Sequence, residues 1–383
     1  MNIKSTLLFF FISSFVIKPS HSNAQAVNVQ DSLALVDLYN STDGPHWRYN
    51  YNWLTSAPVS LWGKIKVKNG RVVEINLQHN NLEGNIPSSI GDLTNLEFLY
   101  LYQNKLSGII PPEIGNLKNL QNLYLSSNNF SGNIPSELSK LEKIINLYLL
   151  SNHLSGNIPP ELGNLKSLAI LYLDDNDLSG SIPPALGNLT SLEILSLSYN
   201  QLSGNIPPEL SNIPRLNDLQ LHYNQFTGSI PPELGKLKFL QRIILSNNQL
   251  SGSIPPELGN LTSLTTLLLD NNLLDGSIPL ELGNLPDLFW LYLNNNHLSG
   301  NIPPELGNFK NLQYLYLNNN ELTGNIPVSL NDLPLKYRLD IFNNYFTFNG
   351  MEMIVQSHSN TIYSPQATIP LHQNNNYLYV SDI

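Results

Sequence analysis

The chain has 383 residues, of which 13% are charged, and it carries a net charge of −10. A net negative protein is repelled by nucleic acids and by anionic membrane surfaces, so neither is an expected partner. The sequence contains no cysteine, which excludes disulfides, thiolate nucleophiles and cysteine-ligated metals. A fold of this chain must therefore be held together by its packed core.

Residues 1–26 have the pattern of a secretory signal peptide. Lys4 supplies a positive start, an apolar run follows from Leu7 to Ile17, and small residues precede a cut after Ala26. The apolar run is too short to cross a membrane as a helix. We therefore predict a secreted or cell-surface protein whose mature chain has no transmembrane segment.

Residues 27–71 are predicted to form an N-terminal cap. An amphipathic helix is indicated by Leu33, Leu35, Val36 and Leu38. Three tryptophans then supply the bulk that would cover an exposed core: Trp47, Trp53 and Trp62.

A period of 24 residues organises residues 72–347. Each copy follows the pattern Leu-x-Leu-x-x-Asn-x-Leu, with Ile or Phe at some leucine positions, as at Leu99, Leu101 and Asn104. All copies except the twelfth are followed by Gly and by Ile-Pro. Twelve copies follow one another without an insertion, which makes chance agreement negligible. Their asparagines are Asn80, Asn104, Asn128, Asn152, Asn176, Asn200, Asn224, Asn248, Asn272, Asn296, Asn320 and Asn344.

Each position of the repeat has a physical role. Side chains alternate across a strand, so Leu99 and Leu101 would face the core while Tyr100 and Tyr102 face solvent. The asparagine amide, with two donors and an acceptor, can pair buried backbone groups of adjacent coils. We predict that the twelve asparagines form a structural asparagine ladder. The segment after Ile-Pro, with proline and often glutamate at its start, favours a short helical or 3₁₀ turn.

This consensus resembles the plant-type extracellular leucine-rich repeats of receptor-kinase ectodomains and polygalacturonase-inhibiting proteins. The N-terminal segments Asp43-Gly44-Pro45-His46-Trp47 and Asn69-Gly70-Arg71-Val72 are closer to secreted bacterial leucine-rich-repeat proteins. The resemblance implies an α/β solenoid: a right-handed superhelix with a concave parallel β-sheet, a second small sheet on its flank, and short turns on the convex side. It also implies recognition of peptides, proteins or carbohydrates.

Two sets of aromatic residues fall at solvent-facing strand positions and are the predicted ligand-binding residues. The tyrosine ladder consists of Tyr100, Tyr124, Tyr148 and Tyr172, and the aromatic cluster consists of Trp290, Tyr292, Tyr314 and Tyr316. Tyrosines also stabilise strands by stacking on their neighbours, so the ladder is equally compatible with a packing role. For the cluster we favour binding, because exposed aromatic rings with polar tips are enriched at binding hot spots.

Nothing in the sequence matches a catalytic, nucleotide-binding or metal-binding motif. The one metal-like string, Asp175 to Gly180, lacks the acidic residue that an EF-hand loop needs at its twelfth position, which is Leu186. Acids at Asp174, Asp175, Asp177, Asp218 and Asp270 form an acidic strip near His222 and Arg242, which favours hydration over ligand binding. We expect no enzyme activity, no cofactor and no metal.

Residues 348–383 are predicted to be a C-terminal cap, with the start of a truncated further module as the alternative for their last part. A short closing helix is expected at 350–357, and extended segments at 362–366 and 378–380. The leading hypothesis for the whole chain is a secreted, non-catalytic recognition protein that binds a polypeptide or a glycan on its concave face. The alternatives are an inhibitor of a secreted hydrolase and a structural or adhesive spacer.

Overall fold

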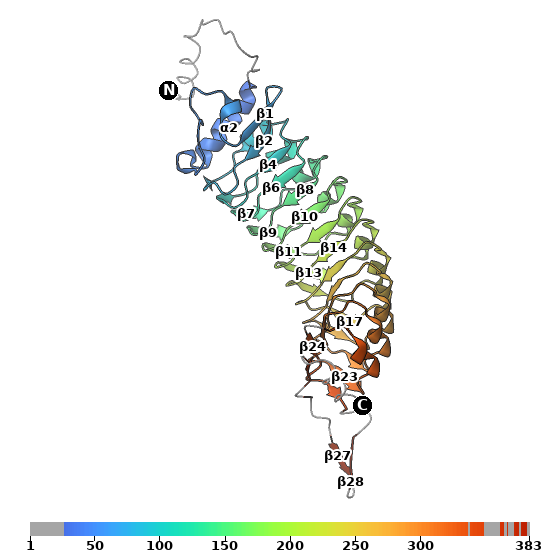
Figure 1. Cartoon of the computed structure of the whole chain (residues 1–383). Coiled ribbons are helices and arrows are strands. Elements are labelled where there is room, and N and C mark those ends of the chain that lie inside the picture. The colour runs from blue at the N-terminus through green and yellow to red at the C-terminus, as the bar shows by residue number, and fades with distance from the viewer. Residues whose placement is uncertain are drawn as a thin grey trace, which may run out of the picture.

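The computed structural model describes residues 27–335, 338–347, 361–363, 366, 371–374 and 377–380. The predicted signal peptide, residues 1–26, and the predicted closing helix at 350–357 lie outside the described residues. Within them, the chain forms an elongated, curved solenoid that begins at helix α2 (Figure 1).

The N-terminal segment covers the first coil. Helix α2, Val29–Ser41, begins where the Asn28 side chain accepts hydrogen bonds from the amides of Gln30 and Asp31. The buried Asp31 carboxylate forms an ion pair with Arg71 and accepts a hydrogen bond from the Val72 amide.

Three tryptophans lie beneath this helix. Trp47, Trp53 and Trp62 are buried, and Trp53 contacts each of the other two within 5.0 Å between ring centroids. Each indole N–H donates to a backbone carbonyl, as a buried indole requires. Leu33, which we expected on the buried face of the helix, is instead exposed, because the contact with the core is made by Ala34, Leu35 and Leu38. The 3₁₀ turns η1 and η2 of this segment are Gly44–His46 and Val59–Leu61.

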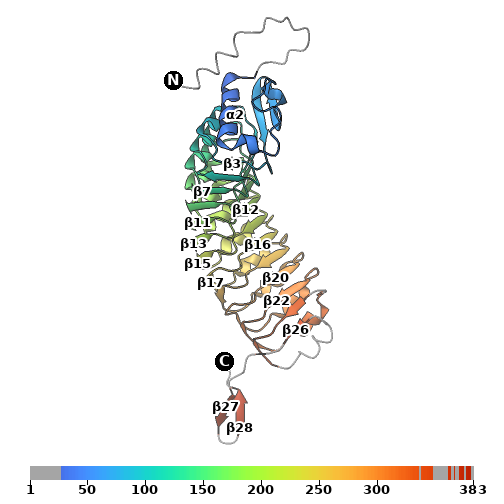
Figure 2. The same cartoon turned by 90° about the vertical axis from the view of Figure 1, so that its left-hand side faces the viewer.

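A 14-stranded sheet lines the concave face of the described solenoid (Figures 1 and 2). Its first pair is antiparallel and all later pairs are parallel. Its strands are β1 Ile65–Lys68, β2 Arg71–Asn76, β4 Phe98–Tyr100, β6 Asn122–Tyr124, β8 Asn146–Tyr148, β10 Ile170–Tyr172, β12 Ile194–Ser196, β14 Asp218–Gln220, β16 Arg242–Ile244, β18 Thr266–Leu268, β20 Trp290–Tyr292, β22 Tyr314–Tyr316, β24 Arg338–Asp340 and β26 Thr361–Ile362.

A second set of short parallel strands runs along the flank, as the resemblance to plant-type repeats implied (Figure 2). They begin after each ladder asparagine, and all except the last contain or directly precede a glycine at positive φ. At Gly180, with φ 75°, an added Cβ would clash with the Asn157 Oδ1 atom. These strands are β3 Glu83–Gly84, β5 Lys105–Gly108, β7 Asn129–Asn133, β9 His153–Asn157, β11 Asp177–Gly180, β13 Gln201–Asn205, β15 Gln225–Thr227, β17 Ser251–Ser253, β19 Leu273–Asp275, β21 Ser299–Gly300, β23 Glu321–Gly324 and β25 Tyr345–Phe346.

Five-residue 3₁₀ turns line the convex side. Most begin with a proline, whose missing N–H costs nothing at a helix start. The turns are η3 Ser88–Asp92, η4 Pro112–Asn116, η5 Ser136–Lys140, η6 Pro160–Asn164, η7 Pro184–Asn188, η8 Pro208–Asn212, η9 Pro232–Lys236, η10 Pro256–Asn260, η11 Leu280–Asn284, η12 Pro304–Asn308 and η13 Val328–Asp332.

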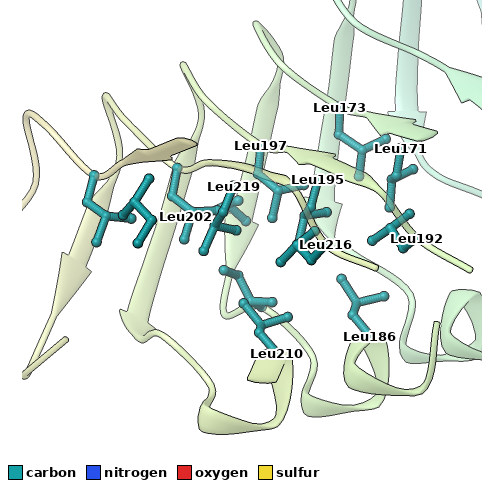
Figure 3. Packing of buried hydrophobic residues seen from close by; sticks show 14 of the residues in the cluster. Leu171, Leu173, Leu186, Leu192, Leu195, Leu197, Leu202, Leu210, Leu216 and Leu219 are labelled. Carbon is teal, nitrogen blue, oxygen red and sulfur yellow. The ribbon is translucent and has the colours of Figure 1, made fainter. Parts of the chain in front are cut away.

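The core is a column of leucine and isoleucine side chains between the concave strands and these turns. Figure 3 shows Leu195 and Leu197 of one coil projecting inward together with Leu171, Leu173 and Leu219 of its neighbours. All five have no exposed surface. Each coil therefore buries its apolar side chains only by stacking on the coils beside it.

The asparagine side chains connect successive coils through backbone groups. Asn200 donates from Nδ2 to the carbonyls of Leu173 and Leu197, at 3.0 and 3.1 Å, and its Oδ1 accepts from the Leu178 amide at 3.0 Å. The same contacts recur from coil to coil, with nearly constant distances. At the first coil, the Tyr49 backbone of the cap exchanges hydrogen bonds with Asn80. After the last asparagine, Gln366 accepts from the Asn344 amide and donates to the Ile341 carbonyl.

We expect the substitution Asn200→Ala to lower the free energy of unfolding by about 1 to 3 kcal/mol, because the Leu178 amide and the Leu173 carbonyl would lose their partner. Asn205→Ala, at an exposed flank position, is the matched control and should change stability by less than about 0.5 kcal/mol. Denaturant unfolding of both variants measures the difference. Equal losses would show that the ladder hydrogen bonds do not contribute to stability.

Of the extended segments expected from the sequence, the one at 378–380 lies within strand β28, Tyr377–Val380, whereas the one at 362–366 overlaps strand β26, Thr361–Ile362, only at its first residue. Strand β26 extends the concave sheet by pairing with β24, through Leu339 with Thr361 and Asp340 with Ile362. Strand β27, Leu371–Asn374, pairs with β28 as an antiparallel hairpin.

Candidate ligand-binding face

The concave sheet arranges its outward-facing residues in straight columns. From β2 to β24, neighbouring strands pair without a shift in register, so each residue lies beside the residue 24 positions later. Parallel strands are separated by roughly 4.8 Å, which sets the spacing within a column. The column through Tyr100 and Tyr292 is called here the inner column, and the column through Phe98 and Trp290 the outer column.

The tyrosine ladder is a continuous stack in the inner column. Tyr124 and Tyr148 lie parallel, at 4.2 Å between centroids and 3° between planes, and Tyr100 and Tyr172 meet this pair edge-on at 5.0 and 4.9 Å. Burial, followed by the neighbouring tyrosines, raises the pKa of Tyr124 well above its ordinary value. Much of the ring surface of the ladder is thus used in contacts within the protein.

The aromatic cluster lies on strands β20 and β22. Trp290 stacks on Tyr314 in the outer column, at 6.3 Å and 14°, while Tyr292 meets Tyr316 edge-on in the inner column, at 4.4 Å and 87°. Burial raises the pKa of Tyr292 and of Tyr316, so both phenols stay neutral and able to donate a hydrogen bond at ordinary pH. The indole of Trp290 is 37% exposed, whereas the other three tryptophans are buried.

Phe289, which the sequence did not single out, extends this cluster. Its ring centroid lies 4.2 Å from that of Trp290 and 6.2 Å from that of Tyr314. Phe289 directly precedes strand β20, and its amide donates to the Thr265 carbonyl of the previous coil. Its position just outside the alternating pattern of the strand explains why the pattern gave no sign of it.

A second aromatic pair was also missed, at the edge where the concave strands end. Tyr199 and Tyr223 stack at 4.5 Å and 14°, with His222 edge-on to Tyr199. They are 50% and 47% exposed, and both have positive φ, at 53° and 52°. Asparagine, serine or aspartate occupies this left-handed position in most coils, and a bulky residue there is unusual. The sequence signal that could have revealed this pair is that tyrosine, in place of a small polar residue, directly precedes two successive ladder asparagines.

The acidic strip between the two aromatic sets is largely paired within the protein. Asp218 accepts from Arg242 and Gln220, each at 2.9 Å, and Asp174 accepts from the Ser198 amide and the Ser196 hydroxyl. Burial raises the pKa of Asp174, Asp218 and Asp270 above the ordinary value, although these hydrogen bonds act in the opposite direction. Asp174, Asp218 and Asp270 are thus partly or fully buried and paired within the protein, whereas the sequence suggests only a hydrated strip.

Asp174→Asn should stabilise the protein more at about pH 7 than at about pH 3.5. Because the pKa of Asp174 is raised in the folded state, the parent loses unfolding free energy as pH rises from the unfolded-state pKa of about 3.9 to the higher folded value. Asparagine does not titrate, so the variant escapes this loss. Melting temperatures of both proteins across this range measure the effect. A difference between them that stays constant with pH would contradict the raised pKa.

Metal-binding and membrane-spanning features are not found in the described part of the chain. No group of three or more His, Asp or Glu residues there could hold a metal ion. Of the helices described, none has both the length and the apolar character needed to cross a bilayer.

Comparison with known proteins identifies the family to which this repeat architecture belongs. Residues 65–227 match the family described as leucine-rich repeat region, and residues 239–261, 263–285, 287–309 and 311–333 match the leucine-rich repeat itself. Together these segments cover more than half of the chain.

Solved structures similar to the chain include two plant receptor kinases and a bacterial leucine-rich-repeat protein. The ectodomain of the receptor kinase GASSHO1/SCHENGEN3 from Arabidopsis thaliana, in complex with CASPARIAN STRIP INTEGRITY FACTOR 2, is 33% identical over 88% of this chain and 44% of its own, with a TM-score of 0.79. The Arabidopsis receptor kinase HAESA, in complex with the peptide hormone IDA and the co-receptor SERK1, is 33% identical over 83% of this chain and 54% of its own, with a TM-score of 0.74.

The third is a leucine-rich-repeat protein of Leptospira interrogans. It is 32% identical over 76% of this chain and 83% of its own, with a TM-score of 0.53. The chain thus spans about half the length of the two receptor ectodomains and most of the bacterial protein. The repeat matches, the parallel concave sheet and these similarities together show that the chain belongs to the leucine-rich-repeat proteins.

Proposed function

We propose that this protein is a secreted, non-catalytic recognition protein that binds a polypeptide or a glycan on its concave face. The observation that carries the proposal is the aromatic cluster, where Trp290 is exposed on the concave sheet beside three half-buried tyrosines. Aromatic side chains with a polar tip supply large contact area at a small entropic cost, and they dominate binding hot spots.

Two further observations support recognition. The concave sheet is uninterrupted from β2 to β26, so an extended ligand could contact many coils at once. The two receptor ectodomains to which the chain is similar were solved in complexes, one of them with a peptide hormone. A peptide or protein partner is therefore the first class to test.

The alternatives predict other outcomes for the same surface. An inhibitor of a secreted hydrolase would capture that enzyme and lower its activity. A structural or adhesive spacer would use its length and its ends, and its concave face would bind nothing. Capture experiments separate these three functions.

Recognition is tested by immobilising the full chain and exposing it to secreted proteins and soluble surface polysaccharides. Three forms are compared: the parent, the double variant Trp290→Ala with Tyr316→Ala, and a control with Tyr49→Ala and Tyr51→Ala, two exposed tyrosines of the cap. We expect the parent and the control to capture the same ligand and the double variant to lose it. Capture by none of them, or equally by all three, would contradict the proposal.

A further inference from the structure

A shallow, open pocket lies beside the aromatic cluster, at the edge where the chain enters the concave strands. Its volume is about 680 Å³, and Phe289 and Trp290 form its apolar wall. The polar residues around it are Gln241, Ser263, Thr265, Asp287, Asn311 and Gln313. They come from four successive coils, so the pocket runs across the strands.

The aromatic wall is held in place by its own contacts. The Phe289 and Trp290 rings lie 4.2 Å apart at 53°, and Tyr314 stacks on Trp290 from the next coil. The backbone amide of Phe289 donates to the Thr265 carbonyl at 2.8 Å. A fixed and exposed indole offers a stacking surface without the entropic cost of ordering it on binding.

The polar rim provides neutral hydrogen-bonding groups of both kinds. The Thr265 hydroxyl donates to the Gln241 carbonyl, which leaves its oxygen as an acceptor. Asn311 donates to the Pro286 carbonyl and lies 3.5 Å from the Asp287 carboxylate, so its amide plane is fixed. Amides and hydroxyls each carry donors and acceptors, and Asp287 is the one charged residue around the pocket.

We propose that this pocket binds a neutral saccharide chain, with one sugar ring stacked on Trp290 and its hydroxyls paired with the amides of Asn311 and Gln241. A sugar ring has C–H groups on its face and hydroxyls on its rim, which match an aromatic wall with a ring of neutral polar groups. An anionic sugar is disfavoured by Asp287 and by the net charge of −10. An open pocket spanning several coils suits a chain better than a single sugar.

This inference rests on the proposed recognition function, and it names the ligand class at the outer edge of the same surface. The saccharide site depends on Trp290, which a polypeptide ligand on the concave face would also contact. It depends in addition on Asn311, which lines the pocket and lies outside the aromatic cluster. Tyr316 lies in the inner column and does not line the pocket. Asn311→Ala therefore distinguishes a saccharide in the pocket, whose binding it weakens, from a ligand held by the aromatic cluster alone, whose binding it leaves unchanged.

The test uses the difference in exposure between Trp290 and the other three tryptophans of the full chain. Because Trp47, Trp53 and Trp62 are buried, quenching of tryptophan fluorescence by acrylamide reports mainly on Trp290. The probes are cellohexaose, xylohexaose, mannohexaose and chitohexaose, with an oligogalacturonate as the anionic control. Binding is measured in parallel by calorimetry, which also follows the variant Trp290→Phe, in which the reporting indole is missing.

We expect at least one neutral hexasaccharide to bind and to protect Trp290 from acrylamide, and the oligogalacturonate to bind at least about tenfold more weakly. Trp290→Ala and Asn311→Ala should each weaken that binding about tenfold or more, while the conservative variant Trp290→Phe and the control Tyr49→Ala, in the cap, stay within about threefold of the parent. Failure of all four neutral probes to bind, or equal binding by Asn311→Ala and the parent, would overturn the saccharide site. The recognition function itself would fail only if no captured ligand of any class depended on Trp290 and Tyr316.

Discussion

Leu197→Ala should lower the free energy of unfolding by about 2 to 5 kcal/mol, the loss typical of a large-to-small substitution in a packed core. Leu197 has no exposed surface and lies between leucines of its own coil and of both neighbours (Figure 3). Strand β12, which directly precedes Leu197, pairs with β10 on one side and with β14 on the other, so the backbone here is fixed. The cavity left by the missing side chain therefore cannot collapse without separating coils.

Leu273→Ala is the matched control, because it makes the same chemical change at an exposed flank position. It should cost less than about 0.5 kcal/mol. Denaturant unfolding followed by circular dichroism measures both variants. A loss below about 0.5 kcal/mol for Leu197→Ala would be incompatible with the core described above.

The double variant Trp290→Ala with Tyr316→Ala should bind the captured ligand at least about thirtyfold more weakly than the parent, which corresponds to about 2 kcal/mol of binding free energy. The two residues belong to different columns on adjacent strands, so together they remove both sides of the aromatic cluster. Calorimetry or surface plasmon resonance measures the affinity.

The stability of this double variant is the necessary control. Trp290 is 37% exposed, so removing its ring should leave the melting temperature close to that of the parent. A fall in both affinity and melting temperature would indicate that the rings serve packing, and an unchanged affinity would place the ligand elsewhere on the molecule. Tyr199 and Tyr223 are the next candidates in that case, because they form an exposed stacked pair at the edge where the concave strands end.

The repeat allowed much of the fold to be predicted from the sequence. A constant period fixes which residue lies beside which, so the columns through Tyr124 and Trp290 follow from counting, and the structure has the same pairings. The burial of Leu195 and Leu197 follows from alternation along a strand. These properties depend only on local pattern and on stacking of identical units.

Features that depend on side-chain packing could not be predicted in the same way. Leu33 fits an apolar stripe by spacing, but the side of α2 that contacts the core is set by the cap, and Leu33 faces solvent. Phe289 joins the aromatic cluster from outside the strand, through a contact that no periodicity encodes. Likewise, Gln366 continues the contacts between coils although it breaks the 24-residue spacing. It donates to the Ile341 carbonyl of the previous coil, but it accepts from the amide of Asn344 itself.

The sequence predicted which residues of the candidate site share a column, but it did not predict the burial or the contacts of their side chains. Sequence spacing placed Asp218 near Arg242, and the structure adds that Asp218 is nearly inaccessible and paired. It also separates two aromatic sets that look alike in sequence. In the tyrosine ladder the rings cover one another, whereas in the aromatic cluster Trp290 keeps an exposed face.

Hydroxyl-radical footprinting of the complex with the captured ligand tests binding on the concave face most directly. Radical attack oxidises accessible aromatic rings, and Tyr49 and Tyr51 in the cap serve as internal controls because they are exposed and distant in sequence from the aromatic cluster. We predict that the ligand lowers oxidation of Trp290, Tyr292, Tyr314 and Tyr316 and leaves Tyr49 and Tyr51 unchanged. Protection that spares Trp290 and its three tyrosine neighbours would contradict a binding site at this position.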